Sequence, residues 1–357
     1  MANQLPTILS TALDISPSGD RFSPPLSTDI AFGSVSCGGY VACLMTKYAV
    51  VYASKHETMR SQTDIRNSLV QFYRPIIATK PIEMRLREVS LGKAWSTVRV
   101  ETFQFGKIAA SADIWYDYPE VIQALAIQQL ENSHYPSSRP LEARIFDQDL
   151  EWTSYETAFH KTGFRRAHSY ARNLIPKSWP SEIKYTEQWI LPGWDCLPQG
   201  SCTHTSAEKA HWTTEMIQFA IDMSFPVQEN FFPHIPGKKL PMGSISATLE
   251  FAEKQKQARV QGRTNWRVLE DDGSLEPITQ TVNVTLSMST EIKRNLPVDG
   301  VRWLYLRTEV KRIVDGRMDM EILLCDEGLE LIAVSQHVAQ IIPSANKHEK
   351  RGDKAKM

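Results

Sequence analysis

Residues 68–114 read SLVQFYRPIIATKPIEMRLREVSLGKAWSTVRVETFQFGKIAASADI, and this stretch decides the fold class. Within it, apolar Ile82, Met84 and Leu86 alternate with charged residues, a pattern typical of a half-buried strand. Glycine-containing turns at 91–93 and 106–107 then separate two further alternating segments. Short turns of this kind join antiparallel neighbours. The stretch therefore predicts an antiparallel meander.

A helix is expected before this meander, over residues 40–56, YVACLMTKYAVVYASKH. Val41, Leu44 and Tyr48 recur at helical spacing, and most of the remaining positions are apolar as well. A helix that is apolar on nearly every side is buried. We therefore expect a curved sheet to wrap around it.

A second unit repeats this order of elements. A strand at 185–191 precedes a segment with an apolar stripe at Trp212, Met216, Phe219 and Met223, and alternating strands follow. Helix plus meander, twice, predicts an α+β chain with an internal duplication. The predicted divisions are an N-terminal domain, a proline-rich connecting region, a C-terminal domain and a charged tail: 1–135, 136–184, 185–345 and 346–357.

Composition restricts the class of function. The net charge of −1 gives no electrostatic reason to expect a nucleic-acid partner. Five cysteines, an odd number, do not resemble a disulfide framework. The longest apolar run, 40–53, contains Lys47 and is too short to span a bilayer. With no secretory leader recognisable in the first residues, we expect an intracellular protein without a membrane span.

The common catalytic motifs are not found in the sequence. It contains neither a Gly-x-Ser-x-Gly nucleophile elbow nor a glycine-rich phosphate loop. Cys196, Cys202, His204 and His211 cluster along the chain, but their spacing matches no standard zinc pattern. We therefore predict that the protein uses no metal.

Several segments together resemble the acyl-CoA thioesterase II family. FGSVSCGGYVA at 32–42 is similar to the phenylalanine-glycine-glycine start of that family's buried helix, and 68–114 follows its first meander. In the second half, 289–297 and 302–339 look most like the fungal thioesterase-like branch. The resemblance covers roughly 28–118 and 185–342. It implies a double hotdog, two helix-wrapped antiparallel sheets in one chain, and an acyl-CoA or related acyl thioester as substrate.

The resemblance also implies a catalytic site in the second repeat. The family uses no serine nucleophile, metal or cofactor, so the resemblance implies none here, and it holds a hydrolytic water with an aspartate, a threonine and a glutamine. These roles fall on Asp222 in FAIDMSFPV, Thr285 in NVTLSMS and Gln336 in AVSQHV, the last only after a one-residue slip in spacing. The chemistry agrees, because thioester hydrolysis needs a carboxylate to polarise water and donors for the developing oxyanion.

Three further residues are predicted to bind substrate. The amides of Gly38 and Gly39 lie at a helix start, where unpaired N–H groups attract negative charge, so they are candidate oxyanion donors. Arg74, in the Gln-Phe-Tyr-Arg-Pro run, is the third.

Each candidate also has a plainer interpretation. Asp222 as a solvated acid, Thr285 as an ordinary strand threonine and Arg74 as the partner of a nearby acid are all compatible with the sequence. His337, next to Gln336, is an alternative functional group.

Three functions are compatible with the sequence. The first is hydrolysis of an acyl thioester. The alternative is a non-hydrolytic acyl- or polyketide-binding or cyclising component of a fungal specialised-metabolite pathway. The third is a purely structural hotdog partner, which a blocked or filled pocket between the domains would indicate. Self-association into a homo-oligomer also remains open, because hotdog units pair through their sheets. The last residues, Ala355-Lys356-Met357, are a variant of the peroxisomal Ser-Lys-Leu signal, and the plain reading is a charged, solvated tail of a cytoplasmic protein.

Overall fold

The computed structural model describes residues 7–62, 64–117, 149, 151–180, 183–194, 210–225, 227–231, 243–269 and 281–343. Much of the predicted connecting region and the C-terminal Ala355-Lys356-Met357 lie outside the described residues, as do Cys196, Cys202 and His204. No described helix combines the length and apolar character needed to cross a membrane.

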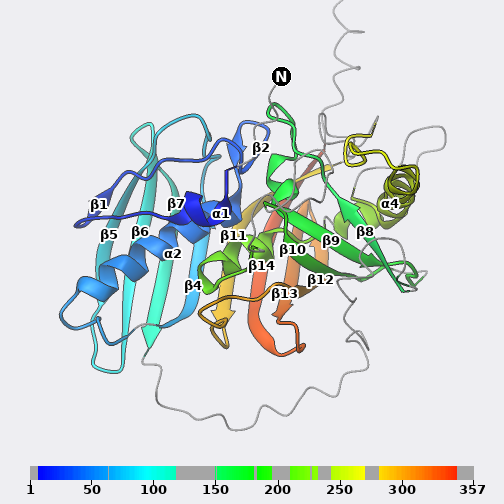
Figure 1. The fold of residues 1–357 in the computed structure, drawn as a ribbon. Coiled ribbons are helices and arrows are strands. Elements are labelled where there is room, and N and C mark those ends of the chain that lie inside the picture. Colours follow the sequence, from blue (N-terminus) through cyan, green and yellow to red (C-terminus); the bar gives the residue numbers. More distant parts are fainter. Residues whose placement is uncertain are drawn as a thin grey trace, which may run out of the picture.

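The predicted central helix is α2, Gly38–Lys55. Its residues from Tyr40 to Met45 are at most 1% exposed, so the first half of the helix is buried on all sides as predicted, whereas Ser54 and Lys55 at its end are exposed. The short α1 (Leu9–Leu13) packs beside it, with Leu9 and Leu13 in the same core. In Figure 1, α2 crosses in front of the strands of the first repeat.

The first repeat contributes five strands to one antiparallel sheet. The predicted meander is confirmed as β5 (Glu83–Ser90), β6 (Trp95–Gln104) and β7 (Lys107–Asp117), with each strand paired to the next. β4 (Asp64–Phe72) pairs with β7, and the short β1 (Arg21–Phe22) pairs with β5 at the edge. A separate ribbon, β2 (Ala31–Phe32) with β3 (Val35–Ser36), leads into α2.

The second repeat continues the same sheet. The sheet order runs β1-β5-β6-β7-β4-β11-β14-β13-β12-β10-β9-β8, so the contact between β4 and β11 joins the two halves. The strands of this half are β11 (Thr281–Ile292), β14 (Leu331–Pro343), β13 (Arg317–Cys325), β12 (Leu304–Val314), β10 (Tyr185–Pro192), β9 (Ala171–Pro176) and β8 (Trp152–Glu156).

The helix of the second repeat is much shorter than that of the first. It consists of the 3₁₀ turn η3 (Thr214–Met216) and α3 (Ile217–Asp222). The predicted stripe residues are all buried, but Trp212 precedes the helix and bridges to Val301. The start of the stripe is therefore extended backbone, and α3 begins about one turn later than the apolar spacing suggests.

The predicted connecting region contains more structure than expected. Strands β8 and β9 lie within 136–184 and extend the sheet beyond β10, with the 3₁₀ turn η2 (Arg166–Tyr170) between them. Of the described prolines of this segment, Pro176 stands at the end of β9 and Pro180 beyond it, where they break no ladder. The proposed limits of the domains remain a prediction.

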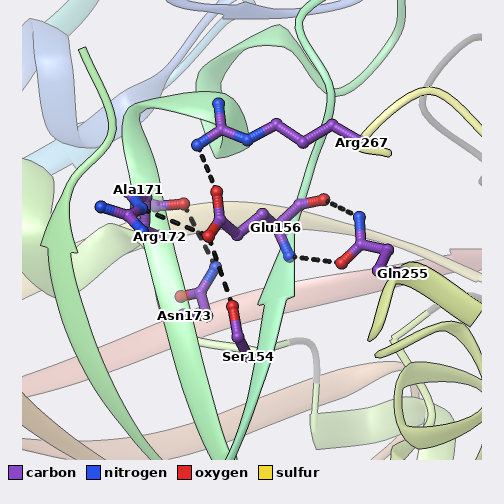
Figure 2. Close-up of polar contacts among 7 residues, drawn as sticks. All are labelled: Ser154, Glu156, Ala171, Arg172, Asn173, Gln255 and Arg267. Carbon is purple, nitrogen blue, oxygen red and sulfur yellow. Dashed lines mark hydrogen bonds and ion pairs between the residues drawn. The ribbon is translucent and has the colours of Figure 1, made fainter. Parts of the chain in front are cut away.

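Helix α4 (Ile245–Val260) is a second element that the sequence pattern did not predict. It packs against β8 through a buried polar cluster, drawn in Figure 2. The Gln255 side chain accepts from the Glu156 amide at 3.1 Å and donates to the Glu156 carbonyl at 2.7 Å. The Glu156 carboxylate pairs with Arg172 at 3.2 Å and also with Arg267. This cluster fastens the outer helix to the edge of the sheet.

A second polar chain fixes α3 over the middle of the sheet. The Gln218 amide donates to the Ser68 hydroxyl of β4 at 2.7 Å, and its carbonyl accepts from the Thr290 hydroxyl of β11 at 3.0 Å. Thr290 is in turn 2.8 Å from the Ser335 hydroxyl of β14. All four side chains are buried, and a satisfied buried network specifies one arrangement. α3 is thereby held across the junction of the two repeats.

Candidate active site

A cavity of about 540 Å³ lies between the two repeats and is the candidate site. Its volume is in the range of small-molecule pockets, and its walls are mostly apolar with a few polar groups, as is usual for ligand sites. The lining residues used below are Gly38, Arg74, Asp222, Thr285 and His337.

Asp222 occupies the last position of α3 and faces the first turn of α2. Its Oδ2 accepts a hydrogen bond from the Gly39 amide at 2.8 Å and another from the Cys37 thiol at 3.2 Å. Within the described residues, Oδ1 has no hydrogen-bond partner. A carboxylate at the C-terminus of its own helix is electrostatically unfavourable, but the N-terminus of the longer α2 compensates. One oxygen is therefore fixed by the first repeat and the other is open to a ligand.

Only glycine fits at position 39. A Cβ there would lie 2.6 Å from both the Asp222 Cβ and the Gln218 carbonyl oxygen. The two helices can approach this closely only because Gly39 has no side chain. The Gly39 amide donates its hydrogen bond to Asp222 and is therefore not free to act as the predicted oxyanion donor. Its role is instead to hold the carboxylate in position. Gly38 lines the cavity and keeps its predicted role as a proposal.

The surroundings raise the pKa values of both the Asp222 carboxyl and the Cys37 thiol. Burial raises the pKa of Asp222, opposed by the hydrogen bonds from Gly39 and Cys37, and the net shift is upward. Burial and the neighbouring carboxylate raise the pKa of the Cys37 thiol well above its usual value. Cys37 is therefore protonated at neutral pH and donates a hydrogen bond to Asp222. A carboxylate with a raised pKa is a stronger base for activating water.

Thr285 lies on β11 at a local irregularity of the sheet. The register of β11 against β14 shifts between Thr285 and Ser287, and Thr285 is paired with Ala339. Both residues line the cavity. Among the described residues, the Thr285 hydroxyl has no hydrogen-bond partner, so it is available to a water or a ligand. The structure thus brings Thr285 and Asp222 to the same cavity.

Gln336 is not brought to this cavity. Its side chain is exposed and is not among the lining residues, whereas His337 is 3% exposed and lines the cavity. Successive side chains of a strand point to opposite faces, so a one-residue slip exchanges inside for outside. The one-residue slip that the resemblance required at Gln336 agrees with this exchange, because the adjacent His337 is the residue that lines the cavity.

Arg74 is exposed at the mouth of the cavity and also borders a neighbouring hollow. It donates to the Ile108 carbonyl at 2.8 Å, and no described carboxylate pairs with it. Among the described residues, Arg74 therefore does not pair with a nearby acid, as its plainer interpretation would require. An unpaired guanidinium at a pocket entrance suits an anionic group of a ligand.

Cys37 was missed at the sequence level. It stands directly before the Gly-Gly pair, and that position is the one signal that could have singled it out. Within the described ranges, no group of three or more His, Cys, Asp or Glu side chains is arranged to hold a metal ion.

Comparisons with known proteins agree with this architecture. Residues 27–117 match the model of the acyl-CoA thioesterase N-terminal domain, and 201–341 match that of the C-terminal domain. Thioesterase-like protein TwmA of Talaromyces wortmannii is 25% identical over 332 residues, covering 89% of this chain and 86% of its own.

Solved structures show the same fold. A putative thioesterase II from Thermobifida fusca superposes with a TM-score of 0.58 at 13% identity, covering 93% of this chain and 98% of the other. A conserved hot dog fold protein from Alicyclobacillus acidocaldarius gives 0.59 at 11% identity, with coverage of 94% and 98%. Acyl-CoA thioesterase II TesB2 from Mycobacterium marinum gives 0.53 at 14%, with coverage of 94% and 99%. The double-hotdog expectation is confirmed, and the chain belongs to the acyl-CoA thioesterase family and, with it, to the thioester hydrolases.

Proposed function

We propose that the protein hydrolyses an acyl-CoA or related acyl thioester to a free acid and a thiol. The observation that carries this proposal is the asymmetry of Asp222, whose Oδ2 is held by Gly39 and Cys37 while Oδ1 has no partner among the described residues. A carboxylate held in this way has one oxygen fixed in position and one ready to accept a proton from water.

The reaction uses water as the nucleophile. Thr285 positions the water, and Asp222 Oδ1 takes its proton as the water oxygen attacks the thioester carbon. The N–H of Gly38 donates to the carbonyl oxygen as negative charge develops on it. When the carbonyl re-forms, the carbon–sulfur bond breaks and the proton on Asp222 passes to the sulfur, so Asp222 is a carboxylate again at the end of the cycle.

Arg74 is proposed to bind the carrier part of the substrate. A coenzyme A thioester carries phosphates, and a guanidinium binds phosphate through short, charge-assisted hydrogen bonds. Because Arg74 is exposed at the cavity mouth, we expect the carrier to lie outside the cavity and the acyl group inside it.

Free-thiol release from a panel of acyl-CoAs of increasing chain length tests this function. We expect release above the uncatalysed rate for at least one chain length. Thiol release indistinguishable from buffer across the panel, with the protein folded, would reject hydrolysis of acyl-CoA.

A second candidate is a non-hydrolytic acyl- or polyketide-binding component. The observation that favours it is the exposure of Gln336, since the glutamine implied by the resemblance does not reach the cavity. Tight binding of an acyl or polyketide-like ligand without thiol release would support this alternative.

A further inference from the structure

The strand that carries Gln336 presents a different residue to the site. Ser335, His337 and Ala339 alternate along β14 and are all buried, at 0%, 3% and 1% exposed, whereas Gln336 is exposed. Side chains two residues apart share a face of the sheet. His337 therefore lies on the inner face of β14, in the row that lines the cavity.

The two neighbours of His337 in this row, Ser335 and Ala339, are each linked to one of the proposed catalytic groups. Ser335 bonds to Thr290, and Thr290 bonds to Gln218 of α3, the helix that ends at Asp222. Ala339, on the other side of His337, is the register partner of Thr285. His337 thus lies on β14 between Ser335, which is bonded through Thr290 to the helix that carries Asp222, and Ala339, which is paired with Thr285.

One nitrogen of the imidazole is without a polar partner among the residues that the structure describes. Its Nε2 is buried and makes no hydrogen bond within the described residues. A buried polar group without a partner destabilises the folded state, and such groups in native proteins call for an explanation. A ligand bound in the cavity would supply the missing partner.

His337 is also neutral under ordinary conditions. Burial lowers its pKa to about 4. A neutral imidazole carries one N–H donor and one acceptor, and such a group polarises the substrate carbonyl in other enzymes. Asp222 shifts in the opposite direction, toward a stronger base. Burial thus acts on both groups, making the Asp222 carboxylate a stronger base and keeping the His337 imidazole neutral, so one site holds a base and a neutral donor.

We propose that His337 is a catalytic residue that donates an N–H hydrogen bond to the thioester carbonyl oxygen, in the place that the family resemblance assigned to Gln336. The inference rests on the proposed function. During attack, the carbonyl electron pair moves to oxygen, where His337 and the Gly38 amide stabilise it. The water proton goes to Asp222 and later to the leaving sulfur. His337 neither gains nor loses a proton.

Three variants separate His337 from Gln336. His337→Phe keeps the ring volume without the donor and should lower kcat by about 10²–10³-fold, as loss of an oxyanion donor does, with KM changed less than about threefold. His337→Gln restores a neutral donor and should recover most of that loss. Gln336→Ala should keep kcat. Full kcat in His337→Phe, or a large loss in Gln336→Ala, would overturn the assignment.

A spectroscopic measurement tests the contact without requiring turnover. The probe is a ketone analogue of acyl-CoA, with CH₂ in place of sulfur and a ¹³C-labelled carbonyl. We expect its bound carbonyl stretch at lower frequency in the wild type than in His337→Phe, with thermal unfolding confirming that both are folded. Equal frequencies would overturn the role of His337.

The same probe distinguishes failure of the His337 proposal from failure of the proposed hydrolysis. A His337-dependent carbonyl shift in a wild type that releases no thiol would reject hydrolysis and leave the His337 contact standing. Thiol release with no His337-dependent shift would do the reverse. Failure of the wild type to bind the analogue would overturn both.

Discussion

Asp222, at the end of the second repeat's helix, accepts a hydrogen bond from the Gly39 amide of the first repeat's helix at 2.8 Å. The proposed base is therefore positioned by the repeat that does not carry it. Neither half of the chain contains the site alone, because the carboxylate comes from one repeat and the positive helix end that holds it comes from the other.

Replacement of Gly39 should damage both fold and site. In Gly39→Ala, the new Cβ would lie 2.6 Å from the Asp222 Cβ, so α3 must shift. We expect a loss of about 1–3 kcal/mol in the free energy of unfolding and a drop of about 10²-fold in kcat/KM. Thermal unfolding and thiol release measure the two effects.

Gly38→Ala is the matched comparison for stability. Its Cβ would meet the Phe72 ring at 3.4 Å and the Asp222 carboxylate at 3.6 Å, which are ordinary contacts. Its melting temperature should remain close to that of the wild type. Equal melting temperatures for Gly39→Ala and the wild type would contradict the close approach of the helices.

Cys37 should control the pH dependence of the reaction. Asp222 acts as a base only when ionised, so kcat/KM should fall as pH falls through its folded pKa, which lies above the ordinary 3.8. The Cys37 hydrogen bond favours the ionised form. Cys37→Ala should therefore move the acid limb to higher pH, while Cys37→Ser, which keeps a donor, should leave it near the wild-type position. A limb that stays in place or moves to lower pH in Cys37→Ala would exclude this role.

Arg74 should recognise the carrier rather than the acyl group. Arg74→Ala should raise KM for an acyl-CoA by about tenfold, since a hydrogen bond to a charged group contributes roughly 1.5–3 kcal/mol. The same acyl group on N-acetylcysteamine, which has no phosphate, should show little change. Arg85→Ala is the control, because it removes an exposed cation that pairs with Glu83 within β5 and is not among the residues lining the cavity. Equal effects on both thioesters would show that Arg74 does not contact phosphate.

The Glu156 cluster should make stability depend on acid pH. Burial opposes ionisation of Glu156, but the guanidinium groups of Arg172, Arg267 and Arg259 outweigh it and lower its pKa to about 2. A lowered folded pKa means that this contribution to stability is present above about 4.5, the usual glutamate pKa, and is lost as pH falls from there toward 2.

Glu156→Gln should reduce the free energy of unfolding at pH 7 by about 3–5 kcal/mol and flatten that acid dependence. Denaturant unfolding at several pH values measures both. Glu250→Gln, which breaks an exposed pair with Lys254 on α4, should cost less than about 1 kcal/mol. Similar losses in the two variants would show that burial of the cluster is not what stabilises α4.

The sequence predicted the elements that have strong local patterns. The apolar helix at Gly38–Lys55 and the alternating strands β5, β6 and β7 follow directly from their periodicity. α4 was missed because its apolar and polar residues form no clear stripe; its contact with the sheet uses Gln255 and its buried partners instead. Such pairing depends on residues about a hundred positions apart, which local patterns do not reveal.

The site was predictable only in part for a related reason. Asp222 and Thr285 could be placed because their segments resemble the family, but Gln336 and His337 differ by one position on a strand. Which of them points inward depends on the register of β14 against its neighbours β11 and β13, and register is a tertiary property. The engagement of the Gly39 amide by Asp222 likewise depends on how two helices pack.

Thiol release by wild-type protein and by Asp222→Asn, on the best acyl-CoA of the panel, tests most directly whether Asp222 is the base that activates water. Asparagine keeps the shape of the side chain and can still accept from the Gly39 amide, but it cannot take a proton from water. We expect Asp222→Asn to bind the ketone analogue as the wild type does and to lose at least about 10²–10⁴-fold in kcat. A kcat within a few-fold of the wild-type value in Asp222→Asn would show that Asp222 is not the base.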